Sequence, residues 1–255
     1  MTSSFQDHFS SVATRYAESR PGYPPELFAW LAGQCPGHTL AWDCGAGTGQ
    51  ASKGLAEHFE RVWATDGSAA QIAQATPHPR IDYRCAQAEQ SGLPPQSASL
   101  VVVAQALHWF DLPSFYAEAR RVLQPEGVVA VWCYGVLRVE GEPVNDLVQH
   151  FYHQEVAAHW PPERRHVENG YRDLAFPFQA IPTPEFSMSA AWNLEQLLGY
   201  FSSWSATARY LKTLGSDPVA ALRPRLAAVW GEATQPRRVQ WPLSMRVGTV
   251  ARSHH

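Results

Sequence analysis

The sequence has almost no lysine, no excess of either charge and no long apolar run. Lys53 and Lys212 are its two lysines, so arginine supplies nearly all of the positive charge. The 20 basic and 23 acidic residues give a net charge of −3, which argues against a protein built to bind a nucleic-acid backbone. No stretch reaches the roughly 18 apolar residues of a membrane span, and the opening MTSSFQDHF lacks the basic end and apolar run of a secretion signal. We therefore expect a cytoplasmic protein with neither a nucleic-acid nor a membrane partner.

Cysteine is also scarce, and its positions argue against a metal or redox centre. No C-x-x-C pair occurs among the four cysteines, Cys35, Cys44, Cys85 and Cys133. Such isolated thiols are expected to be reduced and mostly buried in a cytoplasmic protein. His150 and His153 would share one face of a helix, but no second cluster of possible ligands accompanies them. We expect no metal site.

Residues 37–135 alternate short apolar segments with helical patterns, at the spacing of an α/β core. The most apolar run, 100–104, lacks polar alternation, as expected of a central parallel strand that is covered on both faces. A turn is expected at 124–127. The alternation predicts an α/β, Rossmann-like, doubly wound and mostly parallel sheet that binds ligands beyond the carboxyl ends of its strands. The expected strands are 40–42, 61–65, 81–85, 100–104 and 128–132, and the expected helices are 50–58, 68–75 and 112–123.

Three further segments complete the predicted organisation. Residues 1–36 form an N-terminal helical cap, in which RPGYPP separates a first helix from a second at 26–32. Residues 136–184 are an insertion after the fifth strand that is expected to cover the substrate and to contain a helix at 143–160. Residues 185–255 supply two more strands, which makes seven in all. Their expected elements are strands at 185–192 and 239–250 and helices at 194–204, 206–214 and 219–231.

A glycine-rich turn, DCGAGTG at 43–49, joins the first strand to the next helix. Glycines permit positive φ and a close approach of the backbone to a ligand, and the helix that follows presents unpaired N–H groups. The spacing is G-x-G-x-G, with Asp43 two residues before the first glycine. A dinucleotide site would have G-x-G-x-x-G, but Ser52 stands where its last glycine belongs. The turn therefore favours a nucleoside cofactor that has no diphosphate.

The second strand ends at Asp66, 17 residues after Gly49. A carboxylate at this point of a nucleoside-binding sheet can accept hydrogen bonds from both hydroxyls of a ribose. The order of the two features, a glycine turn after the first strand and an acid after the second, is typical of a nucleoside site. We therefore expect the turn and Asp66 to act together.

Four ordered motifs, DCGAGTGQ, ATDGS, AQAEQSGLP and LQPEG, resemble those of class I S-adenosylmethionine (SAM)-dependent methyltransferases. More narrowly, YAESRPGYP and AQALHWFD are similar to the methyltransferase type 11 group, which includes trans-aconitate methyltransferase-like enzymes. The resemblance covers most of the chain, including YFSSWSA and VQWPLSMRVG near its end. It implies a seven-stranded sheet whose last strand is antiparallel. It also implies SAM as the cofactor, S-adenosylhomocysteine as its product, and a small-molecule substrate bound by a monomer or homodimer.

The resemblance further implies which residues contact the cofactor. The glycine turn would pass under the methionine part of SAM, Asp66 would hold the ribose, and Gln87 and Ala88 would face the adenine edge. Arg20 would pair with the cofactor carboxylate. Ala98 departs from the pattern, because relatives often have Asp at that position. The implied cofactor-binding residues are Tyr16, Arg20, Asp43, Gly45, Ala46, Gly47, Gly49, Asp66, Ser68, Gln87, Ala88 and Gln105.

Methyl transfer needs an electron-rich acceptor atom aligned with a good leaving group, so the protein mainly positions and desolvates the reactants. A carboxylate acceptor is ionised at neutral pH and needs no base, whereas an alcohol or amine needs one. His108 follows the fourth strand at the edge where the methyl group is expected, and we predict that it orients the acceptor or serves as the catalytic base. Methylation of a carboxyl oxygen is the leading expectation, with a hydroxyl oxygen next. The predicted substrate contacts are Trp109, Tyr134, Trp204 and Arg209, the last as a partner for an anionic acceptor.

Two other functions stay open on the sequence alone. One is a nicotinamide-dependent oxidoreductase, against which the glycine spacing argues. The other is a protein that binds SAM without catalysis, which the alanine at position 98 and the lack of an evident base leave open. Stabilisation of the protein by NADH and not by SAM would indicate the oxidoreductase. Binding of SAM without methyl transfer to any acceptor would indicate the non-catalytic protein.

Overall fold

Residues 22–250 are described by the structure, a computed structural model of the 255-residue chain. The first predicted helix, with Tyr16 and Arg20, lies outside these residues. The second predicted helix is α2, Pro25–Gln34. It begins at a proline, which is tolerated in the first turn because the N–H that proline lacks would have no partner there.

A mixed sheet of nine strands forms the centre of the described chain, in the order β3-β2-β1-β4-β5-β9-β6, with β7 and β8 also paired to β9. The first five strands are parallel, and β9 is antiparallel to every strand that it pairs with. The predicted α/β class with a mostly parallel sheet is therefore confirmed. The strands are β1 (Leu40–Cys44), β2 (Arg61–Asp66), β3 (Ile81–Cys85), β4 (Ala98–Ala104), β5 (Leu123–Tyr134), β6 (Arg138–Val139), β7 (Gln179–Ile181), β8 (Ser187–Trp192) and β9 (Arg237–Thr249).

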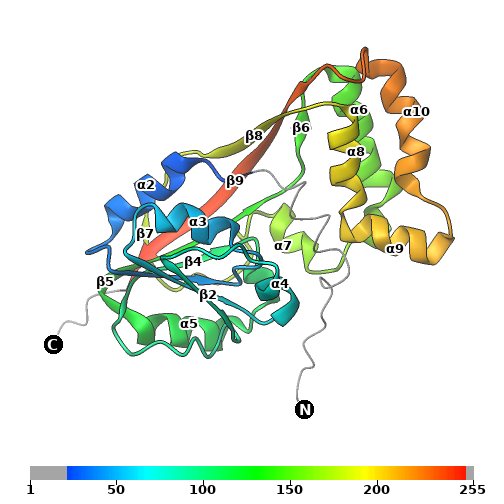
Figure 1. Ribbon diagram of the computed structural model, residues 1–255. Coiled ribbons are helices and arrows are strands. Elements are labelled where there is room, and N and C mark those ends of the chain that lie inside the picture. Colours follow the sequence, from blue (N-terminus) through cyan, green and yellow to red (C-terminus); the bar gives the residue numbers. More distant parts are fainter. Residues whose placement is uncertain (1–21, 251–255) are drawn as a thin grey trace.

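The seven predicted strands are all present, and the described residues form two more, β6 and β7, which were not predicted. These two strands have two and three residues, too few for an alternating pattern. They form because β9 has 13 residues and changes partners along its length. Its residues 237–242 pair with β6 and β8, and its residues 243–249 pair with β5 and β7. Figure 1 shows β9 running from the parallel part of the sheet to a group of helices at the far end.

Helices cover both faces of the parallel part (Figure 1). Central strand β4 shows why its sequence lacks alternation, since its side chains are buried on both sides. Leu100 and Val102 pack in one apolar cluster with α2 and α3, whereas Val101 and Val103 pack in a second cluster with α5. The helices that connect the parallel strands are α3 (Gln50–Ala56), α4 (Ala69–Ala73) and α5 (Leu112–Val122), with a 3-10 turn, η1 (Leu107–Trp109), after β4.

Helices from two separate stretches of the chain form the group at the far end of β9 (Figure 1). One of them follows β6 and the other three follow β8, and α10 contacts the other three. Asn193 and Gln196 cap α8 reciprocally, each side chain accepting from the other's backbone N–H at 2.9 Å. We refer to these helices as the helical cluster. Its members are α6 (Glu142–His150), α8 (Leu194–Ser202), α9 (Ser205–Leu214) and α10 (Pro218–Trp230).

The predicted helix at 143–160 is wrong in its second half. The α-helix ends at His150, and a π-helical turn at Phe151–Glu155 and a 3-10 turn at Ala157–His159 follow. The ring of Phe151 stacks on Trp204 at 6.0 Å between centroids, and the adjacent Tyr152 contacts Trp160 at 5.0 Å. A π turn is a local irregularity that lets both of these neighbouring aromatic residues be buried. The short helix α7 (Arg164–Glu168), which was not predicted, comes next.

The predicted turn at 124–127 is instead a bulge within β5. The pairing with β4 shifts from Ala98–Leu123 to Leu100–Val128, so the extra residues bulge out of the ladder. Glu126 adopts a φ of 64° within this bulge. Ala98, where relatives often have Asp, is fully buried in the apolar cluster that α5 covers, an environment that suits alanine.

Candidate functional site

The glycine turn after β1 has a backbone that only glycine accommodates without strain. Gly45, Gly47 and Gly49 have φ angles of 73°, 57° and 87°, in the left-handed region. A Cβ on Gly45 would lie 2.7 Å from the Cβ of Ala106, and one on Gly49 would lie 2.2 Å from the Tyr83 hydroxyl oxygen. The turn is therefore packed against a side chain of β3 and against the segment that follows β4, with no room for side chains at these two positions.

Main-chain and carboxylate hydrogen bonds join this turn to the end of β2. The N–H groups of Gly45 and Ala46 donate to the carbonyl of Thr65, at 2.8 and 2.9 Å. Asp66 accepts from the N–H of Gly47 through Oδ2 and from the N–H of Ser68 through Oδ1, both at 2.8 Å. The ends of β1 and β2 thus form one continuous rim, with the Asp66 carboxylate held within it.

Ser68, Gln87 and Ala88 lie at the same edge of the sheet. The hydroxyl of Ser68 caps α4 by accepting from the N–H of Gln71, at 3.4 Å. Behind the end of β3, Ala86 donates its N–H to the carbonyl of Asp66, at 3.0 Å, which places residues 86–88 beside the β2 end. Gln87 is exposed there, whereas Ala88 is buried. The structure therefore brings these predicted residues together with Asp66.

Asp43 is the most unusual group of the turn, because it is a fully buried carboxyl. Its Oδ2 accepts a hydrogen bond of 2.5 Å from the Ser52 hydroxyl, but its Oδ1 has no hydrogen-bond partner in the described chain. The pKa of Asp43 is raised to about 7, mainly by burial and also by the charge of Asp66, while hydrogen bonds from Ser52 oppose the rise. A buried carboxylate with an unsatisfied oxygen is costly, so this position is suited to receiving a positively charged group.

Gln105 follows β4 with a positive φ of 60°. Its side-chain amide makes two hydrogen bonds to the backbone of Tyr134, donating to the carbonyl at 3.1 Å and accepting from the N–H at 2.8 Å. The side chain thus joins the carboxyl ends of β4 and β5. The structure places it at the predicted edge, where its amide is used to fix the two strand ends.

His108 lies in the 3-10 turn η1, directly after β4. Its Nδ1 is 2.9 Å from the hydroxyl oxygen of Tyr171, a residue 63 positions later in the chain. Burial, together with the positive charges of Arg164 and His166, lowers the pKa of His108 to about 3. The imidazole is therefore neutral at physiological pH, with its orientation set by Tyr171, which is itself fully buried.

The four predicted substrate contacts occupy different surroundings. Trp109 is 36% exposed, and its ring centroid lies 4.7 Å from that of His108. Tyr134 is buried at the end of β5. Trp204 is buried in the helical cluster, where Phe201 and Trp160 lie at 4.6 and 5.4 Å between ring centroids. Arg209 is half-buried on α9 and makes no side-chain hydrogen bond or ion pair with another described residue.

The structure adds residues that sequence reasoning missed. Tyr171 orients His108, and Arg164, on α7, lies among the aromatic rings of Tyr152 and Trp160. α7 packs against both β5 and η1, so these residues belong to the same edge of the sheet as His108. The available signal was the run HWPPERRHVENGYRD, rich in aromatic and basic residues, in which Arg164 and Arg165 look like an ordinary surface pair.

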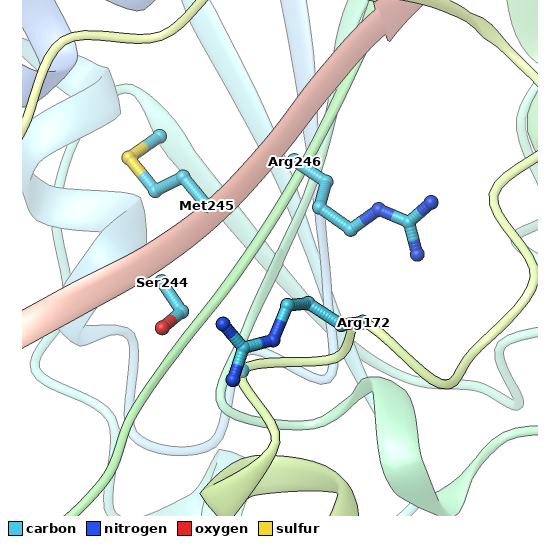
Figure 2. Close-up of a pocket in the computed structure, with 5 residues that line it drawn as sticks. Arg172, Ser244, Met245 and Arg246 are labelled. Carbon is cyan, nitrogen blue, oxygen red and sulfur yellow. The ribbon is translucent and has the colours of Figure 1, made fainter.

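A groove of about 350 Å³ lies against β9 (Figure 2), lined by Gly170, Arg172, Ser244, Met245 and Arg246. The guanidinium of Arg246 donates to the carbonyls of Tyr171 and Leu174, at 2.9 and 2.6 Å. It therefore fixes the loop that carries Tyr171, and through it the position of His108.

The described chain shows no sign of a metal centre or a membrane span. The four cysteines are all free thiols. Within residues 22–250, no three His, Cys, Asp or Glu side chains group closely enough to hold a metal ion, and no helix has both the length and the apolarity to cross a bilayer.

Comparisons with known proteins agree on one family. The profile of the methyltransferase domain matches residues 42–131. A Dictyostelium discoideum protein described as a methyltransferase is 33% identical over 225 residues, which cover 87% of this chain and 86% of that one. A structure described as a type II methyltransferase from Anaeromyxobacter dehalogenans is 48% identical, with a TM-score of 0.86 over 90% of this chain and 97% of that one. A Haemonchus contortus phosphoethanolamine N-methyltransferase, solved with S-adenosylhomocysteine, shares the fold at 14% identity and a TM-score of 0.51, over 98% of this chain and 61% of that one.

Proposed function

This chain belongs to the class I SAM-dependent methyltransferases, and from that premise we propose that it methylates an oxygen of a small molecule, in the first place a carboxylate oxygen. A hydroxyl oxygen is the second choice. The observation that carries the proposal is the state of His108, which is half-buried, hydrogen-bonded to Tyr171 and neutral.

The residues at the strand ends fit SAM. The turn at Gly45, Gly47 and Gly49 is a backbone cradle that side chains would fill, and the unsatisfied oxygen of Asp43 suits the ammonium group of the methionine part. Asp66 would hold the ribose. Ala46, Ser68, Gln87, Ala88 and the backbone at Gln105 complete the proposed cofactor contacts, to which Tyr16 and Arg20 are added from outside the described residues.

When bound, SAM supplies a methyl group on a sulfonium, and the sulfur keeps both electrons of the carbon–sulfur bond when the methyl group is transferred. A carboxylate acceptor thereby becomes a methyl ester, and no proton moves. An imidazole whose conjugate acid has a pKa near 3 is a weak base, and it would deprotonate an alcohol poorly. His108 is better suited to donating a hydrogen bond to the acceptor through the nitrogen that Tyr171 does not contact. This assignment favours an acceptor that is already ionised.

Trp109, Tyr134, Trp204 and Arg209 remain the proposed walls of the acceptor site. Trp109 has the accessibility that a residue at the mouth of the site needs, and the buried Trp204 would act mainly by supporting other aromatic rings. We also propose a cytoplasmic protein that acts as a monomer or homodimer on a free small molecule. The four free thiols support this compartment.

The test uses labelled SAM and a metabolite library, followed by mild alkali. Methyl esters release labelled methanol in base, whereas ethers, N-methyl and C-methyl products keep their label. We expect alkali-labile product, and we expect His108→Asn to retain the activity within about tenfold, because no base is needed. A loss of 10²- to 10⁴-fold, the usual effect of removing a general base, would contradict the carboxylate assignment, as would alkali-stable product.

A further inference from the structure

Arg164 is held among aromatic side chains at the edge of the sheet where the acceptor is expected. Its guanidinium carbon lies 4.7 Å from the ring centroid of Trp160 and 5.6 Å from that of Tyr152. Its Nε donates a hydrogen bond of 2.8 Å to the Tyr152 hydroxyl. The helix that carries it, α7, packs against β5 and against η1, which contains His108.

Within the part of the chain that the structure describes, the guanidinium is oriented by a hydrogen bond at Nε alone. The Tyr152 hydroxyl accepts from Arg164 Nε and donates to Glu168 Oε1, at 2.8 Å in both cases. The two terminal nitrogens of Arg164 make no hydrogen bond or ion pair with any residue of 22–250. The guanidinium therefore presents the edge that can bind a carboxylate with two parallel hydrogen bonds.

Several other arginines of the described chain have partners that neutralise or satisfy them. Arg121 forms an ion pair with Glu118, Arg223 with Glu195, and Arg246 donates to two carbonyls. Arg164 is half-buried, yet among residues 22–250 the one side chain that hydrogen-bonds its guanidinium is the neutral hydroxyl of Tyr152. A positive charge kept partly from water without a carboxylate is costly, and it is compensated when an anion binds.

We propose that Arg164 binds a carboxylate group of the methyl acceptor and so makes the enzyme selective for organic anions with an apolar or planar body. The aromatic rings around the guanidinium would contact that body. This inference rests on the proposed function, because it concerns the acceptor of the same reaction. The packing of α7 against η1 puts Arg164 and His108 on neighbouring elements, and the positive charge of Arg164 contributes to the lowered pKa of His108.

The test compares carboxylates with their primary amides on protein saturated with S-adenosylhomocysteine. The pairs are benzoate and benzamide, phenylacetate and phenylacetamide, and hexanoate and hexanamide, with binding followed by tryptophan fluorescence and calorimetry. For the wild type, we expect at least one acid to bind about tenfold or more tightly than its amide. In Arg164→Gln, we expect the acid to bind within about twofold of the amide.

Arg165→Gln is the matched control, because Arg165 is the exposed neighbour on the same helix, and this variant should keep the preference. Both variants should bind S-adenosylhomocysteine within about twofold of the wild type. Arg164→Lys, which keeps the charge without the planar fork, should keep a reduced preference and covers the case in which Arg164→Gln does not fold. Equal binding of acids and amides to the wild type, or an acid preference that survives in Arg164→Gln, would overturn the inference. Failure of the proposed function would appear separately, as wild-type protein that does not bind S-adenosylhomocysteine or that gives alkali-stable product.

Discussion

The two halves of the proposed site are built in different ways. The cofactor half, residues 43–49, 66–68 and 86–88, is held by backbone groups at the ends of neighbouring parallel strands. The acceptor half, which comprises His108, Tyr152, Trp160, Arg164 and Tyr171, is held by contacts between side chains, one of which joins residues 63 positions apart. A main-chain site tolerates few changes in conformation, whereas a side-chain site can change its specificity one residue at a time. The difference predicts that substitutions in the first half affect cofactor affinity and those in the second affect acceptor selection.

The largest effect is expected from Gly45→Ala. Its Cβ would lie 2.7 Å from the Ala106 Cβ, which is attached directly to the backbone and cannot rotate away, and the φ of 73° adds strain. We expect S-adenosylhomocysteine affinity to fall on the order of 100-fold, about 2.7 kcal/mol, and the free energy of unfolding to fall by about 2–4 kcal/mol.

Gly92→Ala is the control for Gly45→Ala. Gly92 has a similar φ of 75°, but nothing lies within 4 Å of a Cβ built there. This variant should lose about 1 kcal/mol of stability through backbone strain alone and should bind the cofactor product normally. Calorimetric titration and urea unfolding measure both quantities. Equal loss of affinity in the two variants would show that the close packing of the turn is irrelevant to binding.

Asp66→Ala should have the next largest effect. The change removes the acceptor of two backbone hydrogen bonds as well as the proposed ribose contact. Hydrogen bonds to a charged group contribute on the order of 1.5–3 kcal/mol, so the dissociation constant for S-adenosylhomocysteine should rise about 10- to 150-fold. Asp82→Ala removes a carboxylate from the adjacent strand β3, where its ion pair with Arg61 is largely exposed, and should leave the affinity unchanged. Unaltered affinity in Asp66→Ala would refute the ribose assignment.

The cofactor half was largely predictable from the sequence, because its determinants are local. Each determinant is encoded within a few residues: the positive φ at three glycines, the acid at the end of the next strand, and the alternation of strands and helices. Gln105 was predicted as a cofactor contact, but its side-chain amide hydrogen-bonds the backbone at the end of β5 and so joins β4 to β5. That role depends on the register of the two strands, which spacing does not specify.

The acceptor half was mostly unpredictable because its contacts are set by tertiary packing. His108 and Tyr171 are 63 residues apart, and nothing in either segment indicates the other. The sequence analysis predicted one helix at 143–160, but the burial of both Phe151 and Tyr152 is accompanied by a π turn. Tyr152 lies in that turn and accepts a hydrogen bond from Arg164. Because the turn was not predicted, the contact that orients the arginine proposed to bind the acceptor could not be predicted either.

Asp43→Asn separates binding from stability within the cofactor half. The pKa of Asp43 is raised from 3.8 to about 7, so the buried charge destabilises the native state progressively as the pH rises from about 4 to 7, and fully above 7. Asparagine stays neutral, so the variant should be more stable than the wild type by about 1–3 kcal/mol at pH 8 and by much less at pH 4. It should nevertheless bind SAM about tenfold more weakly, because a charged partner is lost. Urea unfolding at the two pH values and SAM titration at pH 8 measure these effects, and a stability difference that does not change with pH would contradict the assignment.

The smallest effect is expected from Tyr171→Phe, in the acceptor half. The change deletes the hydroxyl that orients His108 and leaves the ring in its buried position. A hydrogen bond of this kind contributes about 0.5–1.5 kcal/mol, so kcat/KM for the acceptor should fall roughly 2- to 12-fold. Tyr116→Phe removes a comparable hydroxyl, which donates to the Ala175 carbonyl at 2.7 Å on the α5 side of the sheet. Both variants should bind S-adenosylhomocysteine as the wild type does, but the loss of turnover should occur in Tyr171→Phe and not in Tyr116→Phe. If both variants lost turnover equally, the Tyr171 hydroxyl would act by stabilising the fold and not by orienting His108. His108 would then give no support for a separate acceptor half.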